Sequence, residues 1–240
     1  GAAKPGCRMS HMPTIDDAEF GEIVVRRQAM ATRASLRIAP DGRLRISLPR
    51  SAPIFTAKAL VSSSRKQIRK LLDEHQAQFS YDTDRPIGKS HHLHIETGDT
   101  SDVKIAGTHI IVQIPASKDI RENKIQQMIR AKVLVALRKE AKSYLPRRLK
   151  FLAEKYNFSY DKVKLTHASS RWGSCSSNGT ISLNIALMNL PFELLDYVLV
   201  HELSHTRHMD HSTEFWREVE AIDNQYKQHR SALKKYTPHI

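Results

Sequence analysis

The sequence predicts a fold of the α+β class that begins with a β-rich N-terminal lobe. Residues 22–50 contain short runs in which apolar and polar residues alternate, the period-two pattern of half-buried strands, and residues 80–115 return to strand-like runs. Residues 119–144 instead carry apolar residues near the spacing of one helix face, and a second apolar helical pattern runs into residues 201–205. Both kinds of pattern in one chain indicate a mixed architecture.

The N-terminal lobe is expected to consist of two groups of strands joined by a helix. Three strand-like runs come first: Glu22–Arg27, Ser35–Ala39 and Arg43–Leu48. Asp41-Gly42 lies between the second and third runs, and this dipeptide is a hairpin signal. Residues 54–79 predict one helix. The run from Ile105 to Ile114, interrupted by Gly107, predicts a further hairpin.

The second half of the chain is expected to be mainly helical, with one hairpin. An amphipathic helix begins near Asp119, and Pro146 is expected to end or kink it. The runs Val163–Leu165 and Thr180–Leu183 are strand-like, and Asn178-Gly179 predicts a tight turn just before the second run.

Composition limits the classes of protein to which the chain can belong. Its 240 residues are 40% hydrophobic and 26% charged, which is ordinary for a globular protein, and no stretch of about 18 apolar residues predicts a membrane span. Residues 1–12 look like a vector-derived tail. Cys175 is then the only cysteine of the folded part, which fits a reducing, cytoplasmic location. We expect a lobe at residues 13–115 and a catalytic domain at residues 116–240, or a single unit over about 22–225.

The net charge of +13, from 38 Lys and Arg against 25 Asp and Glu, raises the question of a nucleic-acid partner. The basic residues are spread through the chain, and no known nucleic-acid module pattern accompanies them. A nucleic-acid partner therefore remains an alternative to an ordinary basic surface.

The most informative stretch is His201-Glu202-Leu203-Ser204-His205, an H-E-x-x-H pattern. Residues four apart on a helix project from the same face, so the two histidines can share one metal ion. Glu202 can reach a water molecule on that metal without binding the metal itself. The pattern predicts one Zn²⁺ per chain, His201 and His205 as ligands, and Glu202 as the catalytic residue.

A hydrolytic zinc site needs a third ligand from the protein. His208 lies about seven residues beyond His201 along the helix, which is too far for it to share the ion with both histidines. His211 is the better candidate if the helix ends near His208 and the chain turns back. Asp210, a residue type that tolerates a left-handed turn, precedes it.

Residues 162–188 are the second informative stretch, because a strand beside the metal helix can pair with an extended peptide. The run Ile181–Asn184 is one candidate strand, and the strand that enters the hairpin is the other. Four residues are candidate substrate contacts: Arg171, Trp172, Ser182 and Asn184. Trp172 and Cys175 can equally be packing residues. Cys175 would act as a nucleophile only with a paired base.

The combination of R-W-G-S-C-S, an Asn-Gly hairpin and L-D-Y-V-L-V-H-E-L-S-H-T-R-H-M-D-H-S-T-E-F-W resembles the YgjP-like metallopeptidase family, which is related to the SprT-like zincins. The resemblance covers most of residues 22–225. It implies a zincin fold with a small twisted sheet, an active-site helix that carries H-E-x-x-H and a short turn to the third ligand. It also implies that His201, His205 and His211 bind the metal and that Glu202 is the acid/base. The sequence is not a metzincin, because His208 replaces a required glycine and no Met-turn follows.

These features predict zinc-dependent hydrolysis of peptide bonds in a protein or peptide substrate. A zinc-activated water would attack the carbonyl, with Glu202 as base and then acid. Tyr226, His208 and Arg171 are candidates to stabilise the oxyanion. Two alternatives stay open: a zinc amidase that acts on a non-protein substrate, and a basic nucleic-acid-associated protein whose structural zinc takes His208 as a fourth ligand. SprT relatives include proteases that act on DNA-bound proteins.

Overall fold

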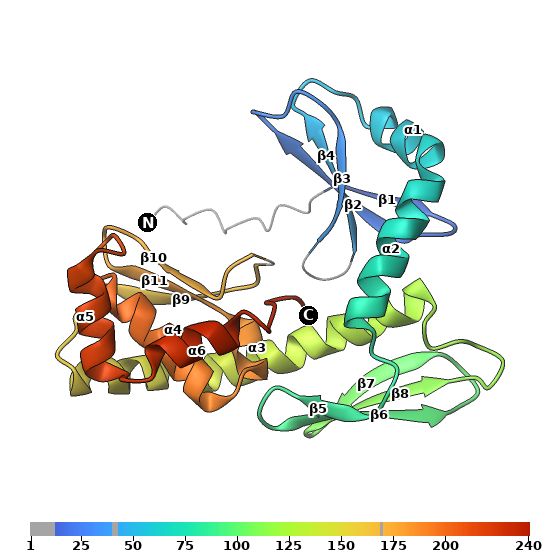
Figure 1. Ribbon diagram of the computed structural model, residues 1–240. Helices are drawn as coiled ribbons and strands as arrows, with labels where there is room; N and C mark the ends of the chain where they lie inside the picture. Colours follow the sequence, from blue (N-terminus) through green and yellow to red (C-terminus); the bar gives the residue numbers. More distant parts are fainter. Residues whose placement is uncertain (1–12, 40–42, 169) are drawn as a thin grey trace, which may run out of the picture. The chain divides into compact units, whose positions relative to one another are not determined.

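The computed structural model describes residues 13–39, 43–168 and 170–240, apart from the side chains of residues 75–79. The chain divides into two compact units, one up to residue 80 and one from residue 81 to the end. Figure 1 labels their elements. The tail expected at residues 1–12 lies outside the described residues, as does the turn expected at Asp41-Gly42.

The first unit is a four-stranded sheet with two helices. Its elements are β1 (Thr14–Asp17), β2 (Gly21–Gln28), β3 (Ser35–Ile38), β4 (Leu44–Pro49), α1 (Phe55–Ser63) and α2 (Arg65–Phe79). The sheet order is β1-β2-β4-β3, with β2 and β4 parallel and the other pairs antiparallel. β3 and β4 pair antiparallel, as the hairpin signal predicts. Ile23, Ile46 and Ile68 are fully buried and join the sheet to α2.

The helix predicted over residues 54–79 is two helices, separated at Ser64. The backbone of Ser64 leaves the helical region, with φ −113° and ψ 15°. Three consecutive serines precede Arg65, and the Ser63 hydroxyl donates to the carbonyl of Leu60. Serine side chains compete in this way for backbone hydrogen bonds, which accounts for the break.

The second unit begins with another four-stranded sheet, which packs on the longest helix. The strands are β5 (Arg85–Ile87), β6 (His91–Thr97), β7 (Asp102–Ala106) and β8 (His109–Ile114), in the order β5-β6-β8-β7. Leu93, Ile110 and Val112 share one core with Ile129 and Val133 of α3 (Asn123–Lys155). The boundary predicted between residues 115 and 116 therefore differs from the structural division after residue 80, because residues 81–115 bury their apolar side chains against this helix.

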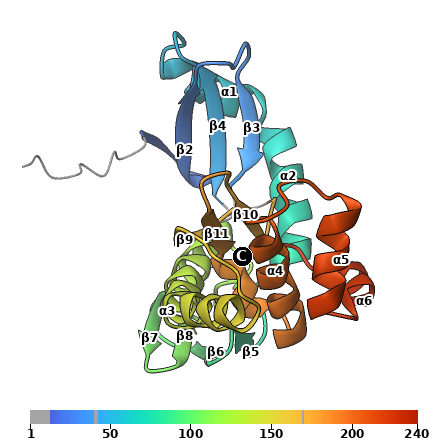
Figure 2. The same cartoon turned by 90° about the vertical axis from the view of Figure 1, so that its left-hand side faces the viewer.

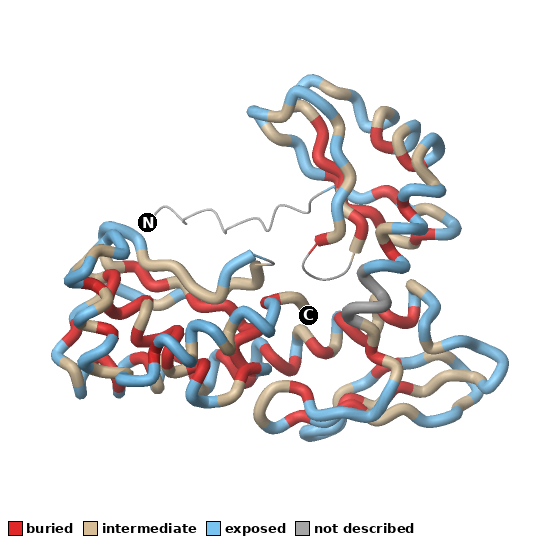
Figure 3. Tube along the Cα trace, in the orientation of Figure 1, coloured by how far each residue is buried: buried red, intermediate tan, exposed pale blue. Residues whose placement is uncertain are grey.

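Helix α3 is a single element of 33 residues and continues through Pro146 instead of ending there. Buried residues recur along its whole length, as the red segments of Figure 3 show. Leu145 and Leu149 are fully buried on either side of the proline. Tertiary packing therefore offsets the backbone hydrogen bond that a proline inside a helix removes.

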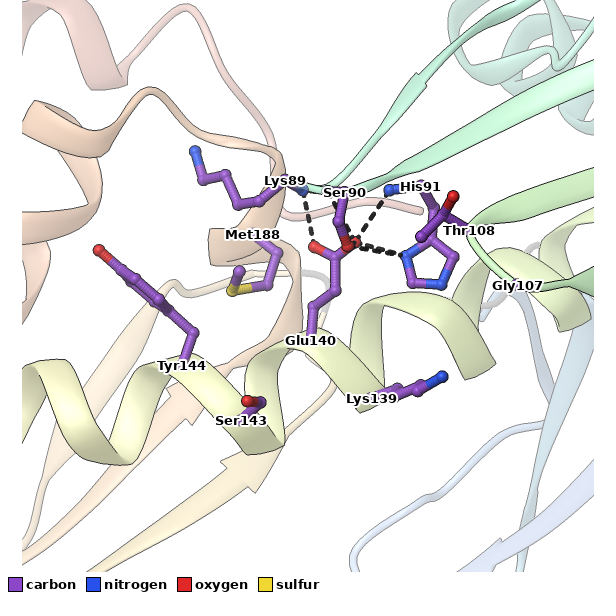
Figure 4. Close-up of a pocket in the computed structure, with 10 residues that line it drawn as sticks. All are labelled: Lys89, Ser90, His91, Gly107, Thr108, Lys139, Glu140, Ser143, Tyr144 and Met188. Atoms are coloured by element: carbon purple, nitrogen blue, oxygen red, sulfur yellow. Dashed lines mark hydrogen bonds and ion pairs between the residues drawn. The ribbon is translucent and has the colours of Figure 1, made fainter.

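The carboxylate of Glu140 fastens α3 to the turn that joins β5 and β6 (Figure 4). It accepts hydrogen bonds from the backbone N–H groups of Lys89, Ser90 and His91, from the Ser90 hydroxyl, and from the His91 ring nitrogen Nδ1 at 2.5 Å. Gly88 has a φ of +63°, and a Cβ there would lie 2.3 Å from Glu140 Oε2. A cavity of about 390 Å³ lies beside this cluster, bounded by Lys89, Thr108 and Tyr144 among others.

The remaining elements form a three-stranded sheet and a group of short helices. They are β9 (Lys162–Thr166), β10 (Gly173–Cys175), β11 (Thr180–Asn184), the 3-10 helix η1 (Ile185–Asn189), α4 (Phe192–Ser204), α5 (Thr213–Ile222) and α6 (Tyr226–Leu233). The sheet order is β10-β11-β9. The tight turn predicted at Asn178-Gly179 is confirmed: it joins β10 and β11, and Gly179 has a φ of +74°. Figure 2 shows α4 beside β10.

The two units together give a mixed α+β protein with three small sheets among its described residues, in line with the predicted class. Among those residues, no helix has both the length and the apolar character needed to cross a membrane.

Candidate metal centre

The H-E-x-x-H stretch occupies the C-terminal end of α4. Buried apolar residues, among them Leu195, Leu199 and Leu203, anchor this helix in the core of the second unit. His201 and Glu202 lie in its last turns, and His205 is the C-cap residue with helical backbone angles. The ligand-bearing end of the helix is therefore held by the core on which the rest of α4 packs.

Three histidines converge beyond this helix end. One ring nitrogen each of His201, His205 and His211 lies within 4.8 Å of the other two, the geometry of a group that could hold a metal ion. The Nε2 atoms of His201 and His211 are 3.2 Å apart. Two nitrogens bound at about 2.0–2.1 Å to one tetrahedral Zn²⁺ stand roughly 3.3 Å apart, so this spacing fits a shared ion.

A tight turn after α4 brings His211 back to the other two histidines. The backbone N–H groups of Arg207 and His208 both donate to the carbonyl of Ser204, so the chain turns directly after His205. The Asp210 carboxylate accepts from the N–H of Ser212, and Ser212 then caps α5. The reversal expected around Asp210 is thus built from these hydrogen bonds, without a left-handed backbone at Asp210.

The environment keeps the rings of His201 and His211 in the neutral form that binds metals. Burial, together with smaller effects of the neighbouring His205 and His211, lowers the pKa of His201 to about 3. Burial and His205 also lower the pKa of His211. The Nδ1 atom of His205 lies 2.9 Å from the carbonyl oxygen of His208. A hydrogen bond there places the proton of His205 on Nδ1 and leaves Nε2 free for an ion.

His208 faces α5 instead of the cluster. Its Nε2 atom is 3.4 Å from a carboxylate oxygen of Glu218, and it is not part of the three-histidine group. Its contribution to the cluster comes from its backbone carbonyl.

Glu202 is a buried carboxylate without a hydrogen-bond partner on Oε2. Its residue is 5% exposed, and burial raises its pKa to about 8, although Arg171 opposes the shift. Gly173 of β10 lies directly against it, since a Cβ at Gly173 would come within 2.6 Å of Glu202 Oε1. A carboxylate that is buried beside a metal-ligand cluster and not bonded elsewhere is available for proton transfer.

The four expected substrate contacts occupy different environments. Arg171 is exposed in the loop before β10, and Trp172 is half-buried against the core. Ser182 and Asn184 lie on β11, which pairs with β10 on one side and β9 on the other. β11 therefore has no free backbone edge, whereas β10, the strand that enters the hairpin, is an edge strand.

Asn184 in particular does not fit the expected contact with a substrate, because it is fully buried. Its Nδ2 donates to the carbonyls of Ala168 and Arg171, and its Oδ1 accepts from the N–H of Ala186. These bonds fasten the loop before β10 to the sheet, which is a structural role.

Cys175 has no feature of an activated nucleophile. It is half-buried, and both burial and the nearby Glu202 raise the pKa of its thiol. A raised pKa disfavours the thiolate that attacks a carbonyl.

Three neighbours of the histidines were not identified from the sequence. The Phe215 ring lies 4.5–5.0 Å from all three histidine rings, and Trp216 stacks on His211 at 5.6 Å. The guanidinium of Arg230 lies over Trp216. Phe215 and Trp216 lie only four and five residues after His211 in the sequence, and this short separation could have identified them as neighbours of the cluster. Arg230 belongs to another helix and offers no such local signal.

A comparison with protein families identifies the group to which this arrangement belongs. The model of the YgjP-like family, described as a metallopeptidase domain, matches residues 32–236. The chain belongs to this family. The family resemblance predicted from the sequence is thereby confirmed, and with it a metal cofactor and the metal-dependent hydrolysis of peptide bonds as the class of activity. A nucleic-acid partner has no support in this match.

Two solved structures show partial similarity to this family member. One is the metallopeptidase zymogen abylysin of Pyrococcus abyssi, 28% identical, covering 38% of this chain and 92% of that one, with a TM-score of 0.34. The other is the metallopeptidase zymogen jannalysin of Methanocaldococcus jannaschii, 20% identical, covering 38% and 93%, with the same TM-score. No curated protein sequence matches the chain.

Proposed function

We propose that this protein is a zinc peptidase of zincin type, with His201, His205 and His211 as the metal ligands and Glu202 as the general base and acid. The observation that carries this proposal is the convergence of the three histidine nitrogens next to a buried, unpartnered carboxylate. Three protein ligands are the number that a catalytic zinc site uses, because a fourth position must stay open for water or substrate.

Zinc, when bound, acts as a Lewis acid that makes a water molecule more acidic and polarises the scissile carbonyl. The chain supplies the proton transfers. Glu202 Oε2, which has no other hydrogen-bond partner, takes the proton of the attacking water and then delivers it to the nitrogen of the leaving amine. Burial raises the pKa of the Glu202 carboxyl group, which makes the carboxylate a stronger base and helps it to hold the proton between the two transfers.

The free edge of β10 is the proposed binding site for the substrate backbone. An extended peptide can add to such an edge through main-chain hydrogen bonds. Gly173 on this strand touches Glu202, so a peptide paired there passes beside the proposed base. Arg171, in the loop before β10, is the remaining candidate for a side-chain contact, and among the three oxyanion candidates it is the most exposed. Tyr226 is buried against Trp216, and His208 faces Glu218.

The alternative of a closed structural zinc site is disfavoured by His208, which would be the fourth ligand but faces Glu218. An amidase with a non-protein substrate would use the same residues. The position of β10 at the edge of its sheet favours an extended peptide over a small amide. The cytoplasmic location suggested by Cys175, the one cysteine after residues 1–12, stays a prediction.

The test combines zinc content with peptide cleavage in four proteins: the parent and the variants Glu202→Gln, His211→Ala and His208→Ala. Each is supplied with zinc, freed of excess metal and incubated with unfolded casein and a mixed peptide library. We expect one zinc per chain in the parent, in Glu202→Gln and in His208→Ala, and a loss of zinc in His211→Ala.

Only the parent and His208→Ala should cleave. Zinc in every protein without cleavage by the parent would contradict the peptidase proposal and leave the amidase alternative. Loss of zinc from His208→Ala, with retention in His211→Ala, would contradict the ligand assignment. Addition of DNA to the same assays tests the nucleic-acid alternative.

A further inference from the structure

The guanidinium of Arg230 stands close to the histidine cluster. Its carbon atom lies 4.7 Å from the centre of the Trp216 ring, and Trp216 stacks on His211 with 5.6 Å between ring centres and 25° between planes. These two separations place the guanidinium carbon within about 10 Å of the His211 ring. Arg230 belongs to α6 and reaches the surroundings of the candidate metal centre through this stack.

The side chain of Arg230 is exposed, and its hydrogen-bond donors are unused within the described part of the chain. Its guanidinium lies over the Trp216 ring. Asp223, the acidic residue just before α6, is bonded instead to Nδ1 of His229 at 2.7 Å. A cation–π contact holds the planar guanidinium in place and leaves its five N–H groups free for a ligand.

Two arginine side chains, Arg230 and Arg171, place positive charge near the histidine cluster and Glu202. Besides burial and the other histidines, Arg230 contributes to the lowered pKa values of His201 and His211. On the other side, Arg171 acts on Glu202 and opposes the effect of burial on its pKa. A bound metal ion would add to this positive charge, which outweighs the two carboxylates beside the cluster, those of the buried Glu202 and of Asp210, and so favours an acidic ligand.

We propose that Arg230 binds a carboxylate of the substrate, so that the enzyme prefers peptides with an acidic residue close to the scissile bond. The guanidinium fork matches a carboxylate with two parallel hydrogen bonds. An extended peptide advances about 3.3 Å per residue, so 10 Å corresponds to roughly three residues. The acidic residue should therefore lie within about three positions of the bond that is cut. This inference rests on the proposed function, because it assumes that peptides are cleaved at this centre.

The experiment uses zinc-loaded full-length protein and a set of quenched fluorescent peptides. The peptides differ at one position only, which is Glu, Gln or Lys, and that position is moved over three residues on each side of the cleaved bond. At one position we expect kcat/KM to be about tenfold higher for the Glu peptide than for its Gln partner. Arg230→Gln should remove this difference, and Arg230→Glu should reverse it in favour of the Lys peptide.

Lys227→Gln is the matched control, because it removes one exposed positive charge from the same helix without touching Trp216. Its preference for the Glu peptide should equal that of the parent. Zinc content and thermal unfolding of each variant establish that it is folded. If Arg230→Gln loses kcat equally on all peptides, the inference is overturned, because Arg230 would then support the reaction without discriminating between acidic and neutral substrates. An unchanged Glu-to-Gln ratio in Arg230→Glu would overturn it as well.

Failure of the proposed function is distinguished by a second readout. If the parent cleaves no peptide, the affinities of the same peptides for zinc-loaded Glu202→Gln are measured by fluorescence anisotropy, with and without Arg230→Glu. If the Glu peptide binds more tightly than the Gln peptide, and Arg230→Glu abolishes this difference, the carboxylate site is supported although no peptide is cleaved. Equal affinities of the Glu and Gln peptides overturn it.

Discussion

At the scale of single residues, the candidate centre depends on a contact between a glycine and a carboxylate. Glu202 is buried next to the histidine cluster, and Gly173 is the residue of β10 that lies against it. Any side chain at Gly173 would occupy space that the Glu202 carboxylate now fills. The position of the proposed base is thus limited by the strand that is also the proposed binding edge for the substrate.

We predict that Gly173→Ala keeps zinc but loses most of its activity. The added Cβ would lie 2.6 Å from Glu202 Oε1 and 2.8 Å from its Cδ, so the carboxylate must shift. A misplacement of about 1 Å costs roughly 100-fold in rate when a catalytic group must be oriented. Zinc content and kcat on a cleaved peptide measure the two effects. Gly98→Ala is the control, because its Cβ meets only the side chain of Gln113. Full activity of Gly173→Ala would show that the Glu202 position is not critical.

We predict that Asn184→Ala destabilises the fold instead of weakening substrate binding. It removes three hydrogen bonds made by a fully buried side chain, and the carbonyls of Ala168 and Arg171 lose this donor. The free energy of unfolding should fall by about 2 kcal/mol or more. Asn184→Asp should be no better, because its carboxylate would face those carbonyls. Thermal unfolding of the zinc-loaded proteins gives the answer. A raised KM at unchanged stability would instead restore Asn184 as a substrate contact.

The grouping of the three histidines could be predicted from the sequence because their spacing is local. His201, Glu202 and His205 lie within one helix turn and a half, and His211 follows after a turn whose residues are all nearby in the chain. Gly173 and Arg230 could not be identified in this way. Their contacts with Glu202 and Trp216 depend on how β10 and α6 pack against α4 and α5, which no local pattern encodes.

At the scale of elements, the position of α3 in the second unit depends on a buried carboxylate as well as on apolar packing. At the turn between β5 and β6, the Glu140 carboxylate accepts hydrogen bonds from three backbone N–H groups, a hydroxyl and a histidine ring (Figure 4). Burial alone would raise the pKa of Glu140, but the hydrogen bonds from His91, Lys89 and Ser90 outweigh it and hold the pKa below the usual 4.5. The folded state therefore favours the ionised form.

We predict that this cluster makes the fold sensitive to acid. A carboxylate whose pKa is lower in the folded state stabilises the fold above its unfolded pKa, and this contribution is lost as the pH falls through the folded value. Glu140→Gln should lower the free energy of unfolding at pH 7 by about 3 kcal/mol, because it leaves His91 without its charged partner. The gap between parent and variant should narrow below about pH 4.5.

Denaturant unfolding at pH 7 and at pH 3.5 measures this gap, with metal-free protein throughout so that zinc release does not contribute. Glu154→Gln is the control on the same helix, since Glu154 is exposed and, among the described residues, forms an ion pair with Lys150 alone, at 3.7 Å. If the difference in free energy of unfolding between parent and Glu140→Gln is the same at both pH values, Glu140 acts through its shape and not through its charge.

The sequence predicted the existence of most elements but not two of their boundaries. Alternation and the Asn178-Gly179 signal located β3, β4 and β11 because these patterns are local. An end of the helix at Pro146, one of the two predicted effects, was wrong: α3 continues through the proline, with Leu145 and Leu149 buried on either side. The break at Ser64 and the attachment of residues 81–115 to α3 were also missed. Such outcomes depend on packing across the fold, which overrides local preference.

At the scale of the whole molecule, the described chain contains two separate cores. One core contains buried residues between Ile15 and Leu72, and the other contains those between Tyr81 and Ile240. The family match over residues 32–236 extends across both units, whereas every residue proposed for the metal centre lies in the second. The second unit thus combines its own core with the complete candidate site.

We therefore predict that a fragment of residues 81–240 folds alone and binds one zinc ion. A unit of this length buries enough apolar surface for independent stability, and its core includes Leu199 and Leu203, which anchor the ligand-bearing end of α4. Circular dichroism should show a cooperative thermal transition, and the fragment should retain one zinc after removal of excess metal.

The same fragment with His211→Ala is the control and should fold without retaining zinc. A fragment that fails to fold, when the full chain folds and binds zinc, would show that the second core needs residues of the first unit. A folded fragment that binds no zinc would place the missing determinant outside residues 81–240, which the three-histidine geometry gives no reason to expect. One zinc in the folded fragment would mean that the metal centre needs only the core of the second unit, so any effect of the first unit on activity must act on the substrate.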